Sequence, residues 1–168
     1  VIDGFGYADC PGHAVWLEPF ERLGGAGSDQ FPLHLISPQP KRKLHSQYDQ
    51  SAYSQAGKIR GREPLTLHPI AAAQRGIKAG DLLRVFNDRG ACVVGAQISE
   101  GVKEDVVILP TGAWFAPSHD EAGLELNGNP NVLTRDKGTS SLAQGPSAHT
   151  CLVDVVKLSE EELQALVV

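Results

Sequence analysis

The chain has 168 residues, a length that fits one globular domain with an attached arm and argues against two separate cores. Hydrophobic residues make up 41% and charged residues 21%, close to the globular average, which excludes wholesale disorder. The 15 Lys and Arg against 20 Asp and Glu give a formal net charge of -5, which argues against a nucleic-acid footprint over the whole surface. A local basic patch remains compatible with that balance.

No stretch approaches the ~18 consecutive apolar residues of a membrane span, and the first residues lack the basic and apolar regions of a signal peptide. We therefore expect neither a membrane nor a nucleic acid as partner. The chain contains no Met and begins with Val1, so we expect a piece of a longer protein. Its three Cys residues, Cys10, Cys92 and Cys151, are widely spaced without a C-x-x-C motif, which predicts separate thiols and neither a disulfide framework nor a zinc site.

Turn-forming residues dominate the start of the chain, and we interpret residues 1–30 as a connecting segment from an upstream domain. The apolar run Phe31–Ser37, bounded by Pro38, predicts a strand. The next stretch, Pro38–Arg62, is rich in Lys, Arg, Gln and Ser, too polar for a core and too long for a simple hairpin. Long loops of this kind are often functional.

The middle of the chain alternates short strands with tight turns. Leu65–Leu67 predicts a strand, followed by a helix that begins at Pro69 and ends at Gly76. Leu82–Phe86 and Ala91–Ile98 are separated by a polar turn and predict a β-hairpin.

The C-terminal part adds two strands and a helix. Val106–Leu109 and Cys151–Leu158 predict strands, and the pair Ser159 and Glu162 predicts a capping box at the start of a short amphipathic helix. About six short strands, one compact helix and long Gly- and Pro-rich loops favour a mainly β fold, an all-β barrel with a minor helical component. We expect the barrel to occupy residues 31–158, with residues 159–168 as a short helix or tail.

Several ordered segments carry a resemblance to a known family. They are LTLHPIAAAQRGIKAGDLLRVFNDRG from Leu65, LPTGAW from Leu109, RKLHSQ from Arg42, and GNPNVLTRD from Gly128 with LAQG shortly after it. Together they resemble the C-terminal cofactor-binding domain of molybdopterin enzymes, in the branch of the dimethyl sulfoxide, trimethylamine N-oxide and biotin sulfoxide reductases. The resemblance runs from about residue 31 to residue 158.

This resemblance implies a double-psi β-barrel that closes over a bis(molybdopterin guanine dinucleotide) molybdenum cofactor shared with upstream domains. It implies S- or N-oxide reduction by oxygen-atom transfer, with the metal ligand outside this chain, so we expect the isolated chain to be inactive. The same branch implies upstream domains of the same enzyme as partners, together with a cytochrome-type electron donor. It also implies a periplasmic location, with a cytoplasmic one as the alternative.

A guanine dinucleotide offers a pyrophosphate, ribose hydroxyls, a guanine edge and a pterin edge. Its site therefore requires backbone N–H groups in tight loops, short polar side chains and a few cations. From this chemistry and the family match we predict a cofactor-binding set on several loops. The set is Ser37, Gln39, His45, Ser46, Gln47, Asn131 and Gln144.

Within that set, His45 and its two successors follow a basic run and are predicted to face pterin and phosphate, with Ser37 at the mouth of the same loop. Gln39 stands where the family more often has His. The amides of Asn131 and Gln144 both donate and accept hydrogen bonds, which suits a base or pterin edge.

The same residues also have ordinary structural interpretations. Without the family match, the His45 loop would be a solvated charged loop, and Asn131 and Gln144 would be a turn and a surface residue. For Asn87 we favour a structural role in the hairpin turn. Trp114 packs either under the cofactor or in the core, and His149 is a weaker pterin-side candidate.

The alternative function is a non-catalytic double-psi barrel of the adaptor type found in AAA ATPases, because the GIKAGD turn also fits that class. The polar motifs around His45 and Asn131 favour the cofactor-binding domain, since an adaptor barrel has no reason to carry them. The Gly24–Gly27 run neither follows a convincing strand nor precedes a helix, which excludes a Rossmann fingerprint.

Overall fold

The computed structural model describes residues 2–166. Its strands are β1 (Leu33–Ile36), β2 (Pro64–Leu67), β3 (Leu82–Asn87), β4 (Gly90–Ile98), β5 (Val106–Ile108), β6 (Leu124–Glu125) and β7 (Leu152–Lys157). Its helices are α1 (Ala52–Gln55), α2 (Pro69–Gln74) and α3 (Glu160–Ala165), with 3-10 turns η1 (Ile2–Phe5) and η2 (Pro130–Val132). None of the helices in this part of the chain has the length and apolar character to cross a membrane.

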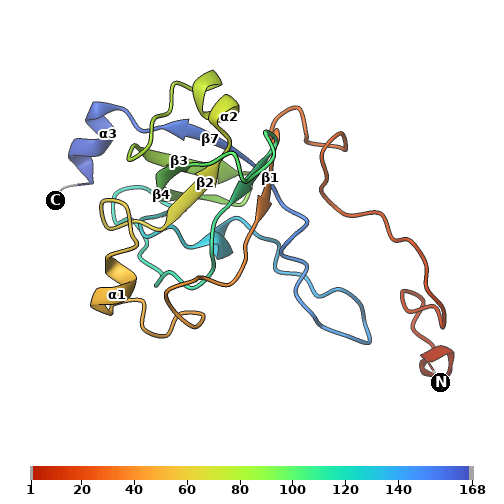
Figure 1. Ribbon diagram of the computed structural model, residues 1–168. Helices are drawn as coiled ribbons and strands as arrows, with labels where there is room; N and C mark the ends of the chain where they lie inside the picture. Colours follow the sequence, from red (N-terminus) through yellow and green to blue (C-terminus); the bar gives the residue numbers. More distant parts are fainter. Residues whose placement is uncertain (1, 167–168) are drawn as a thin grey trace.

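The strands form one sheet in the order β2-β5-β1-β7-β3-β4-β6, and β2 also pairs with β4. This extra pairing closes six of the strands into a barrel and leaves β6 as an addition beside β4 (Figure 1). The pairs β1 with β5 and β2 with β4 are parallel, whereas the other pairs of the closed barrel are antiparallel. The mainly β, double-psi barrel expected from the sequence is confirmed.

Alternating side chains fill the barrel interior, because successive residues of a strand point to opposite faces. In β1, Leu33 and Leu35 are buried while their neighbours are half-buried, and in β2 the buried residues are Leu65 and Leu67. Strand β4 is buried on both faces, since a second apolar cluster, which includes Val93, packs against α3 on the outside of the barrel. The barrel core is therefore formed mainly by side chains of the strands, and the long connecting loops contribute little to it.

The expected helix ends are found in the structure. The side chain of His68 caps α2, Pro69 occupies its first turn, and Gly76 follows it with a φ of 63°. The capping box between Ser159 and Glu162 is present at α3. All three Cys are free thiols, as predicted.

One α-helix and one strand were not predicted from the sequence, and both are very short. Helix α1 is a single turn capped by Ser51, inside the stretch that the sequence predicts as a polar loop. Strand β6 has two residues and joins the sheet by parallel pairing of Leu124 with Ala91. Neither element is long enough to produce a hydrophobic period in the sequence.

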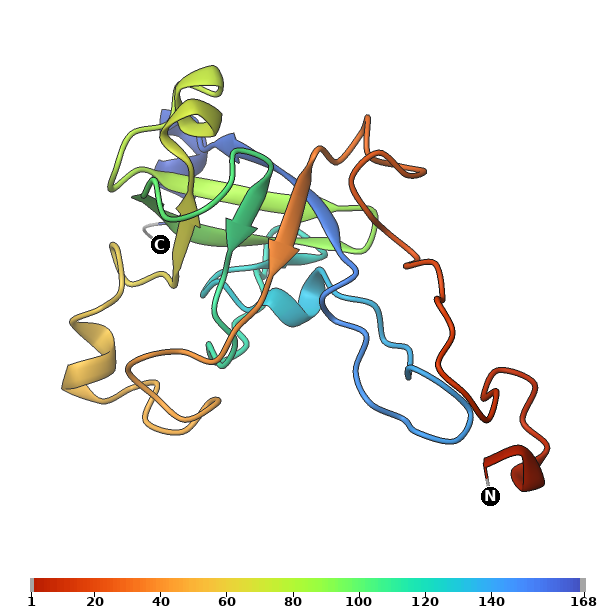
Figure 2. The same ribbon diagram turned by 45° about the vertical axis from the view of Figure 1, so that its right-hand side comes forward.

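The loops gather at one end of the barrel. In both ribbon views α2 lies at the upper end, while the segments 38–62, 112–132 and 136–150 extend from the lower end (Figures 1 and 2). The candidate residues on these segments therefore share one end of the molecule.

The N-terminal segment runs outside the barrel and is attached to it. The carboxylate of Glu21 accepts two hydrogen bonds from Arg89, at 2.6 and 3.0 Å, and one from the backbone N–H of Leu152 at 2.7 Å. The guanidinium of Arg135 lies 4.0 Å from the centre of the Phe20 ring. These contacts connect the segment to the hairpin turn and to the start of β7.

Candidate functional site

His45, Ser46 and Gln47 lie together on a tight, exposed loop. The N–H of Gln47 donates to the carbonyl of Leu44 at 2.9 Å, which closes the turn, and His45 and Tyr48 have φ values of 50° and 65°. These left-handed backbone conformations are uncommon outside glycine and indicate a constrained loop. Among the described residues, the side chains of Ser46 and Gln47 make no hydrogen bond to the chain. Their polar groups are therefore free to meet a ligand.

Four charged side chains lie buried beneath this loop, and we call them the ion cluster: Lys43, Asp49, Lys58 and Glu63. Lys43 Nζ lies 2.6 Å from Asp49 Oδ1 and 2.8 Å from Glu63 Oε2, and Lys58 Nζ lies 3.0 Å from Asp49 Oδ1. The exposed fractions of the four side chains are only 2%, 0%, 3% and 8% in the order Lys43, Asp49, Lys58, Glu63. The expectation that the stretch 38–62 is too polar for a core is thus wrong for the side chains of Lys43, Asp49 and Lys58, which are buried because opposite charges are paired.

Two opposed effects act on the pKa of Asp49. Burial by itself disfavours the charged form and would raise the pKa. Hydrogen bonds from Lys43, from Lys58 and from the backbone N–H of Trp114 outweigh burial and hold the pKa of Asp49 below its ordinary value. Asp49 is therefore a carboxylate at neutral pH, and Lys43 is paired inside the protein instead of presenting its charge to a phosphate.

A second loop touches the first through Gly112 and Trp114. The indole N–H of Trp114 donates to the carbonyl of Ser46 at 2.7 Å. Gly112 has a φ of 91°, and a Cβ at this position would lie 1.8 Å from the carbonyl oxygen of His45. The Trp114 side chain is 53% exposed, so it belongs to the surface beside the His45 loop and the core interpretation is wrong.

The segment that contains Asn131 is joined to the same loops. Asn127 Nδ2 donates to the carbonyl of Trp114 and Asn129 Nδ2 donates to the carbonyl of Ala113, both at 2.9 Å. The backbone N–H of Asn131 donates to Asn129 Oδ1 at 3.0 Å. The Asn131 side chain is exposed, and within residues 2–166 it makes no hydrogen bond. The structure thus brings the His45 loop, Trp114 and Asn131 into one hydrogen-bonded arrangement.

A buried carboxylate supports this segment from inside. Glu125 is fully buried and accepts hydrogen bonds from the backbone N–H groups of Ala116 at 3.1 Å, Asn127 at 2.9 Å and Asn129 at 2.7 Å. Nearby, Arg62 donates to Asn127 Oδ1 at 3.3 Å, and its buried Nε has no partner among the described residues. Sequence reasoning identified neither residue, because a lone Glu or Arg in a polar stretch gives no signal of burial.

Ser37 and Gln39 reach the site indirectly. Ser37 is buried, and its hydroxyl donates to the carbonyl of Leu109 at 2.8 Å, which connects the end of β1 to the end of β5. Gln39 Nε2 lies 3.1 Å from His45 Nδ1 and so positions the imidazole.

Gln144 lies apart from the other candidates. Its Nε2 donates to the carbonyl of Ser140 at 2.7 Å within a loop that projects from the barrel beside the N-terminal segment (Figure 2). Asp9 accepts a hydrogen bond from the N–H of Ser141 at 2.8 Å, which joins the two segments. His149 follows the same loop and is exposed. The structure does not bring Gln144 next to His45.

Asn87 has the structural role expected of it. Its Nδ2 donates to the carbonyls of Leu133 and Leu152 at 2.9 and 3.0 Å, and its Oδ1 accepts from the N–H of Arg89 at 3.0 Å. Asn87 therefore connects the hairpin turn to two distant segments.

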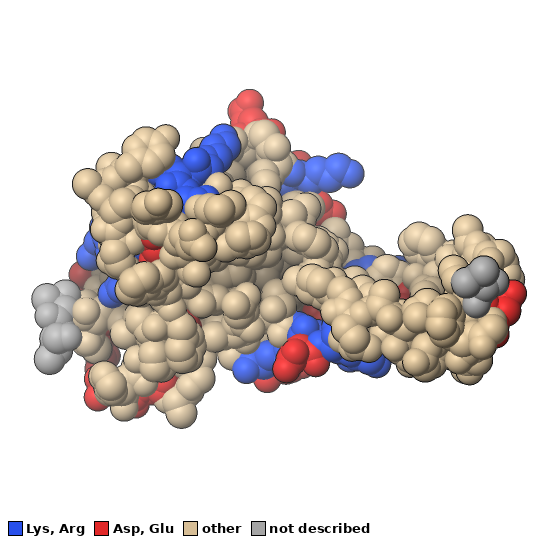
Figure 3. Space-filling model, turned by 90° about the horizontal axis from the view of Figure 1, so that it is seen from below, with Lys and Arg blue, Asp and Glu red and all other residues tan. Residues whose placement is uncertain are grey.

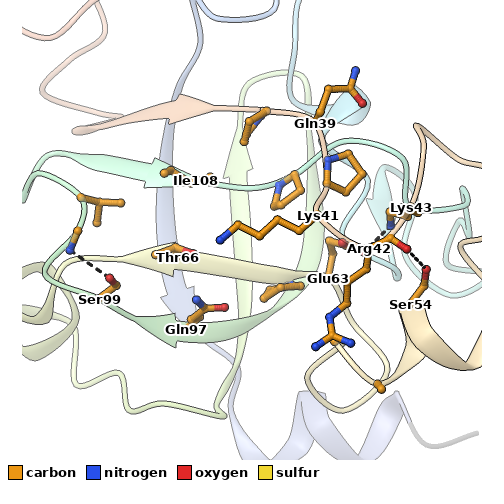
Figure 4. Close-up of a pocket in the computed structure, with 18 residues that line it drawn as sticks. Gln39, Lys41, Arg42, Lys43, Ser54, Glu63, Thr66, Gln97, Ser99 and Ile108 are labelled. Atoms are coloured by element: carbon orange, nitrogen blue, oxygen red, sulfur yellow. Dashed lines mark hydrogen bonds and ion pairs between the residues drawn. The ribbon is translucent and has the colours of Figure 1, made fainter.

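A cavity of about 690 Å³ opens on the outer wall of the barrel next to the segment 38–43. Lys41 projects across it over Thr66 of β2 and Ile108 of β5, and Arg42 turns to the other side (Figure 4). Arg42 lies 4.8 Å from the centre of the Tyr53 ring and donates to the Tyr53 carbonyl at 3.0 Å. Seen from below, most of the surface is uncharged, with Lys, Arg, Asp and Glu in separate small groups (Figure 3).

Comparison with known proteins identifies the family. The family model described as Molydopterin dinucleotide binding domain matches residues 33–152. The chain belongs to this family. Family membership decides against the AAA adaptor alternative, and domains of this family bind molybdopterin dinucleotide.

Curated relatives match almost the whole chain. The chain is 54% identical over 150 residues to the biotin sulfoxide reductase of Cereibacter sphaeroides, covering 89% of this chain and 20% of the relative. It is 46% identical over 158 residues to the dimethyl sulfoxide/trimethylamine N-oxide reductase of the same organism, covering 93% and 19%. It is 45% identical over 159 residues to the trimethylamine-N-oxide reductase of Pasteurella multocida, covering 93% and 19%. The chain thus spans about a fifth of these relatives.

A solved structure shows the same fold. Acetylene hydratase from Pelobacter acetylenicus superposes with a TM-score of 0.73 over 94% of this chain and 22% of that chain, at 18% identity. The likeness supports the fold alone.

The residues of the site fit the cofactor of this family. Ser46, Gln47 and Asn131 present neutral donors and acceptors, which are the groups that a guanine or pterin edge requires. The backbone around them is fixed by the contacts of Gly112 and Trp114. A preset loop of this kind lowers the conformational cost of binding.

Proposed function

We propose that this domain holds part of a bis(molybdopterin guanine dinucleotide) molybdenum cofactor in an oxidoreductase that reduces S- or N-oxides by oxygen-atom transfer. The observation that carries the proposal is the match over almost the whole chain to relatives named biotin sulfoxide, dimethyl sulfoxide and trimethylamine N-oxide reductases. When bound, the cofactor supplies the redox chemistry of molybdenum. The chain itself binds and orients the cofactor.

In this proposal each candidate residue has a stated task. His45, Ser46 and Gln47 face pterin and phosphate, and Asn131 faces a base or pterin edge. The exposed and uncommitted side chains of Ser46, Gln47 and Asn131 support these assignments. Gln144 contacts a part of the cofactor away from His45, because it lies on a different projecting loop.

Ser37 and Gln39 hold the site in shape. Ser37 fixes the end of β1 to Leu109, and Gln39 orients the His45 ring, as their hydrogen bonds support. We propose both as members of the cofactor-binding set that act through neighbouring groups.

The remaining parts of the chain connect the barrel to the rest of the enzyme. We propose that residues 1–30 join the barrel, residues 31–158, to upstream domains of the same polypeptide. We also propose that residues 159–168 form a C-terminal helix or tail; residues 1, 167 and 168 of these ranges lie outside the described part of the chain. Exposed aromatic side chains on the first segment, such as Trp16 and Phe5, support a surface that another domain covers. We also propose that the enzyme receives electrons from a cytochrome-type donor. We propose a periplasmic location, with a cytoplasmic one as the alternative.

Activity measurements test the proposed reaction. The isolated chain, mixed with reduced viologen and trimethylamine N-oxide, dimethyl sulfoxide or biotin sulfoxide, is expected to show no turnover, because the metal ligand lies outside it. The longer enzyme that contains this domain is expected to reduce at least one of these oxides and to contain molybdenum and guanine. Turnover by the isolated chain, or an active enzyme without guanine, contradicts the proposal.

Substitutions test the site. Loss of a polar partner to a buried ligand edge costs about 1–3 kcal/mol. In the longer enzyme, Asn131→Ala and Gln144→Ala should therefore lower the molybdenum and guanine content. Asn87→Ala is the control, since it should change the unfolding free energy only. Equal cofactor content in all three variants removes the assignment.

A further inference from the structure

One carboxylate ties together both ends of the loop that carries His45. Lys43 precedes the exposed part of the loop and Asp49 follows it, and their Nζ and Oδ1 atoms lie 2.6 Å apart. The other carboxylate oxygen of Asp49 accepts the backbone N–H of Trp114 at 3.2 Å. Because the Trp114 indole also donates to Ser46, the His45 loop and the Trp114 loop are joined at two points.

Lys58 and Glu63 complete the ion cluster around Asp49 and Lys43. Lys58 donates to Asp49 Oδ2 at 3.1 Å. Lys43 Nζ donates to Glu63 Oε2 at 2.8 Å, and both of these residues line the cavity drawn in Figure 4. Two ammonium groups thus face two carboxylates, and the ion cluster carries no net charge.

Such a cluster is an inefficient way to gain stability. Removing charges from water is costly, and buried ion pairs are often replaced by apolar side chains without loss of stability. A buried network in which every charge is paired instead holds the groups around it in one fixed arrangement. The apolar residues of the loop do not supply it, since Leu44 and Tyr48 are 59% and 73% exposed. The ion cluster therefore supplies what these apolar side chains do not: it fixes both ends of the His45 loop, in addition to the contacts of Gly112 and Trp114.

We propose that Asp49 is a positioning residue that presets the His45 loop and Trp114 for the guanine dinucleotide. Asp49 does not touch the cofactor, because its carboxylate is fully enclosed by the ion cluster and the Trp114 N–H. It acts through the backbone that presents Ser46 and Gln47. This inference rests on the proposed function, in which these residues meet the cofactor.

The test separates stability from positioning with two variants. Asp49→Leu removes every acceptor and leaves two lysines against Glu63, so it should lower the thermal unfolding midpoint. Asp49→Leu combined with Lys58→Met leaves Lys43 paired with Glu63, so charge balance returns and much of the lost stability should be recovered. Neither variant restores the connection to Trp114.

Three measurements on the 168-residue chain follow: the thermal midpoint, the amide exchange of residues 44–48 and the affinity for guanosine diphosphate by NMR titration. In the double variant we expect a recovered midpoint, loop amides that exchange at least about tenfold faster, and guanosine diphosphate bound at least about tenfold more weakly. The matched control is Asp154→Leu with Arg75→Met, which removes a 3.0 Å ion pair outside the site loops. The control should change neither the loop exchange nor the affinity.

Asp49→Asn is a second variant that keeps the shape and one acceptor oxygen. It should fold, and it should bind guanosine diphosphate less tightly than the unmodified chain. Unchanged affinity and unchanged loop exchange in the folded variants overturn the inference and make Asp49 a structural residue only. If the unmodified chain itself shows no shift of the His45, Ser46 and Gln47 amides with guanosine diphosphate, the proposed function fails, and the inference fails with it.

Discussion

The two site loops, which carry His45 and Trp114, can touch because residue 112 is a glycine and has no Cβ. At Gly112 the backbone is left-handed, with a φ of 91°, and the carbonyl of His45 fills the space that a side chain would occupy. The contact between the Trp114 indole and Ser46 depends on this close approach. The position therefore has two separate requirements, one on conformation and one on space.

We predict that Gly112→Ala lowers the free energy of unfolding by at least about 2 kcal/mol, because backbone strain is added to displacement of the His45 loop. The Trp114 indole N–H should also exchange faster, since its acceptor moves. Gly80→Ala is the control: its φ is 86°, and a Cβ there would meet no atom within 4 Å. This control should cost about 1 kcal/mol and leave Trp114 unaffected. Equal effects on Trp114 in both variants would show that the contact does not depend on Gly112.

At the scale of elements, the sequence predicted those strands and helices whose ends are marked by nearby turn or capping residues. The hairpin of β3 and β4 follows from apolar runs around a polar turn, and the starts of α2 and α3 follow from Pro69 and Ser159. Strand β6 escaped prediction because its two residues are recruited by β4, more than thirty positions earlier in the chain.

The candidate site was predictable only in part. The chemistry of His45 and Asn131 is common to many loops, so their selection depended on the family resemblance. The ion cluster and Glu125 were missed, because Lys, Asp and Glu are seldom buried and nothing in their local sequence pattern marks these particular ones as buried. Polar groups that shape a site from inside thus leave little trace in a single sequence.

Glu125 allows this internal support to be measured. In Glu125→Gln an amide N–H₂ faces a backbone N–H, so at least one of the three hydrogen bonds is lost and a buried donor is left unpaired. We predict a loss of about 2–3 kcal/mol in urea unfolding. Glu121→Gln is the control: it disrupts an exposed pair with Arg84 and should cost less than about 1 kcal/mol. A Glu125 variant as stable as the control would refute the supporting role.

At the scale of the whole molecule, carboxylates tie the peripheral segments to the barrel. Asp49 holds the His45 loop, and Glu21 holds the N-terminal segment through Arg89 and Leu152. Burial raises the pKa of Glu21, but hydrogen bonds from Arg89 and from the Leu152 N–H outweigh it and leave the pKa below its ordinary value. The pKa of Asp49 is lowered in the same way by its own partners.

These directions fix the sign of the pH dependence. A carboxyl group whose pKa is lower in the folded state binds protons more readily when the chain is unfolded, so its stabilisation is complete above the unfolded pKa of about 4. The stabilisation is then lost as the pH falls through the lower folded value. We predict that urea unfolding gives a constant free energy from neutral pH to about pH 5 and a steep decline below about pH 4.

In Glu21→Gln one of these groups no longer titrates, so the decline should be shallower, while the free energy at neutral pH should already be reduced. Limited proteolysis at neutral pH should cleave the segment before residue 30 faster in this variant, because its attachment to Arg89 is weakened. For the cleavage rate, Glu18→Gln is the matched control, since among residues 2–166 Glu18 pairs with Trp16 and Arg22 of the same segment and with no residue of the barrel. If both variants give the slope and the cleavage rate of the unmodified chain, Glu21 does not hold the segment on the barrel.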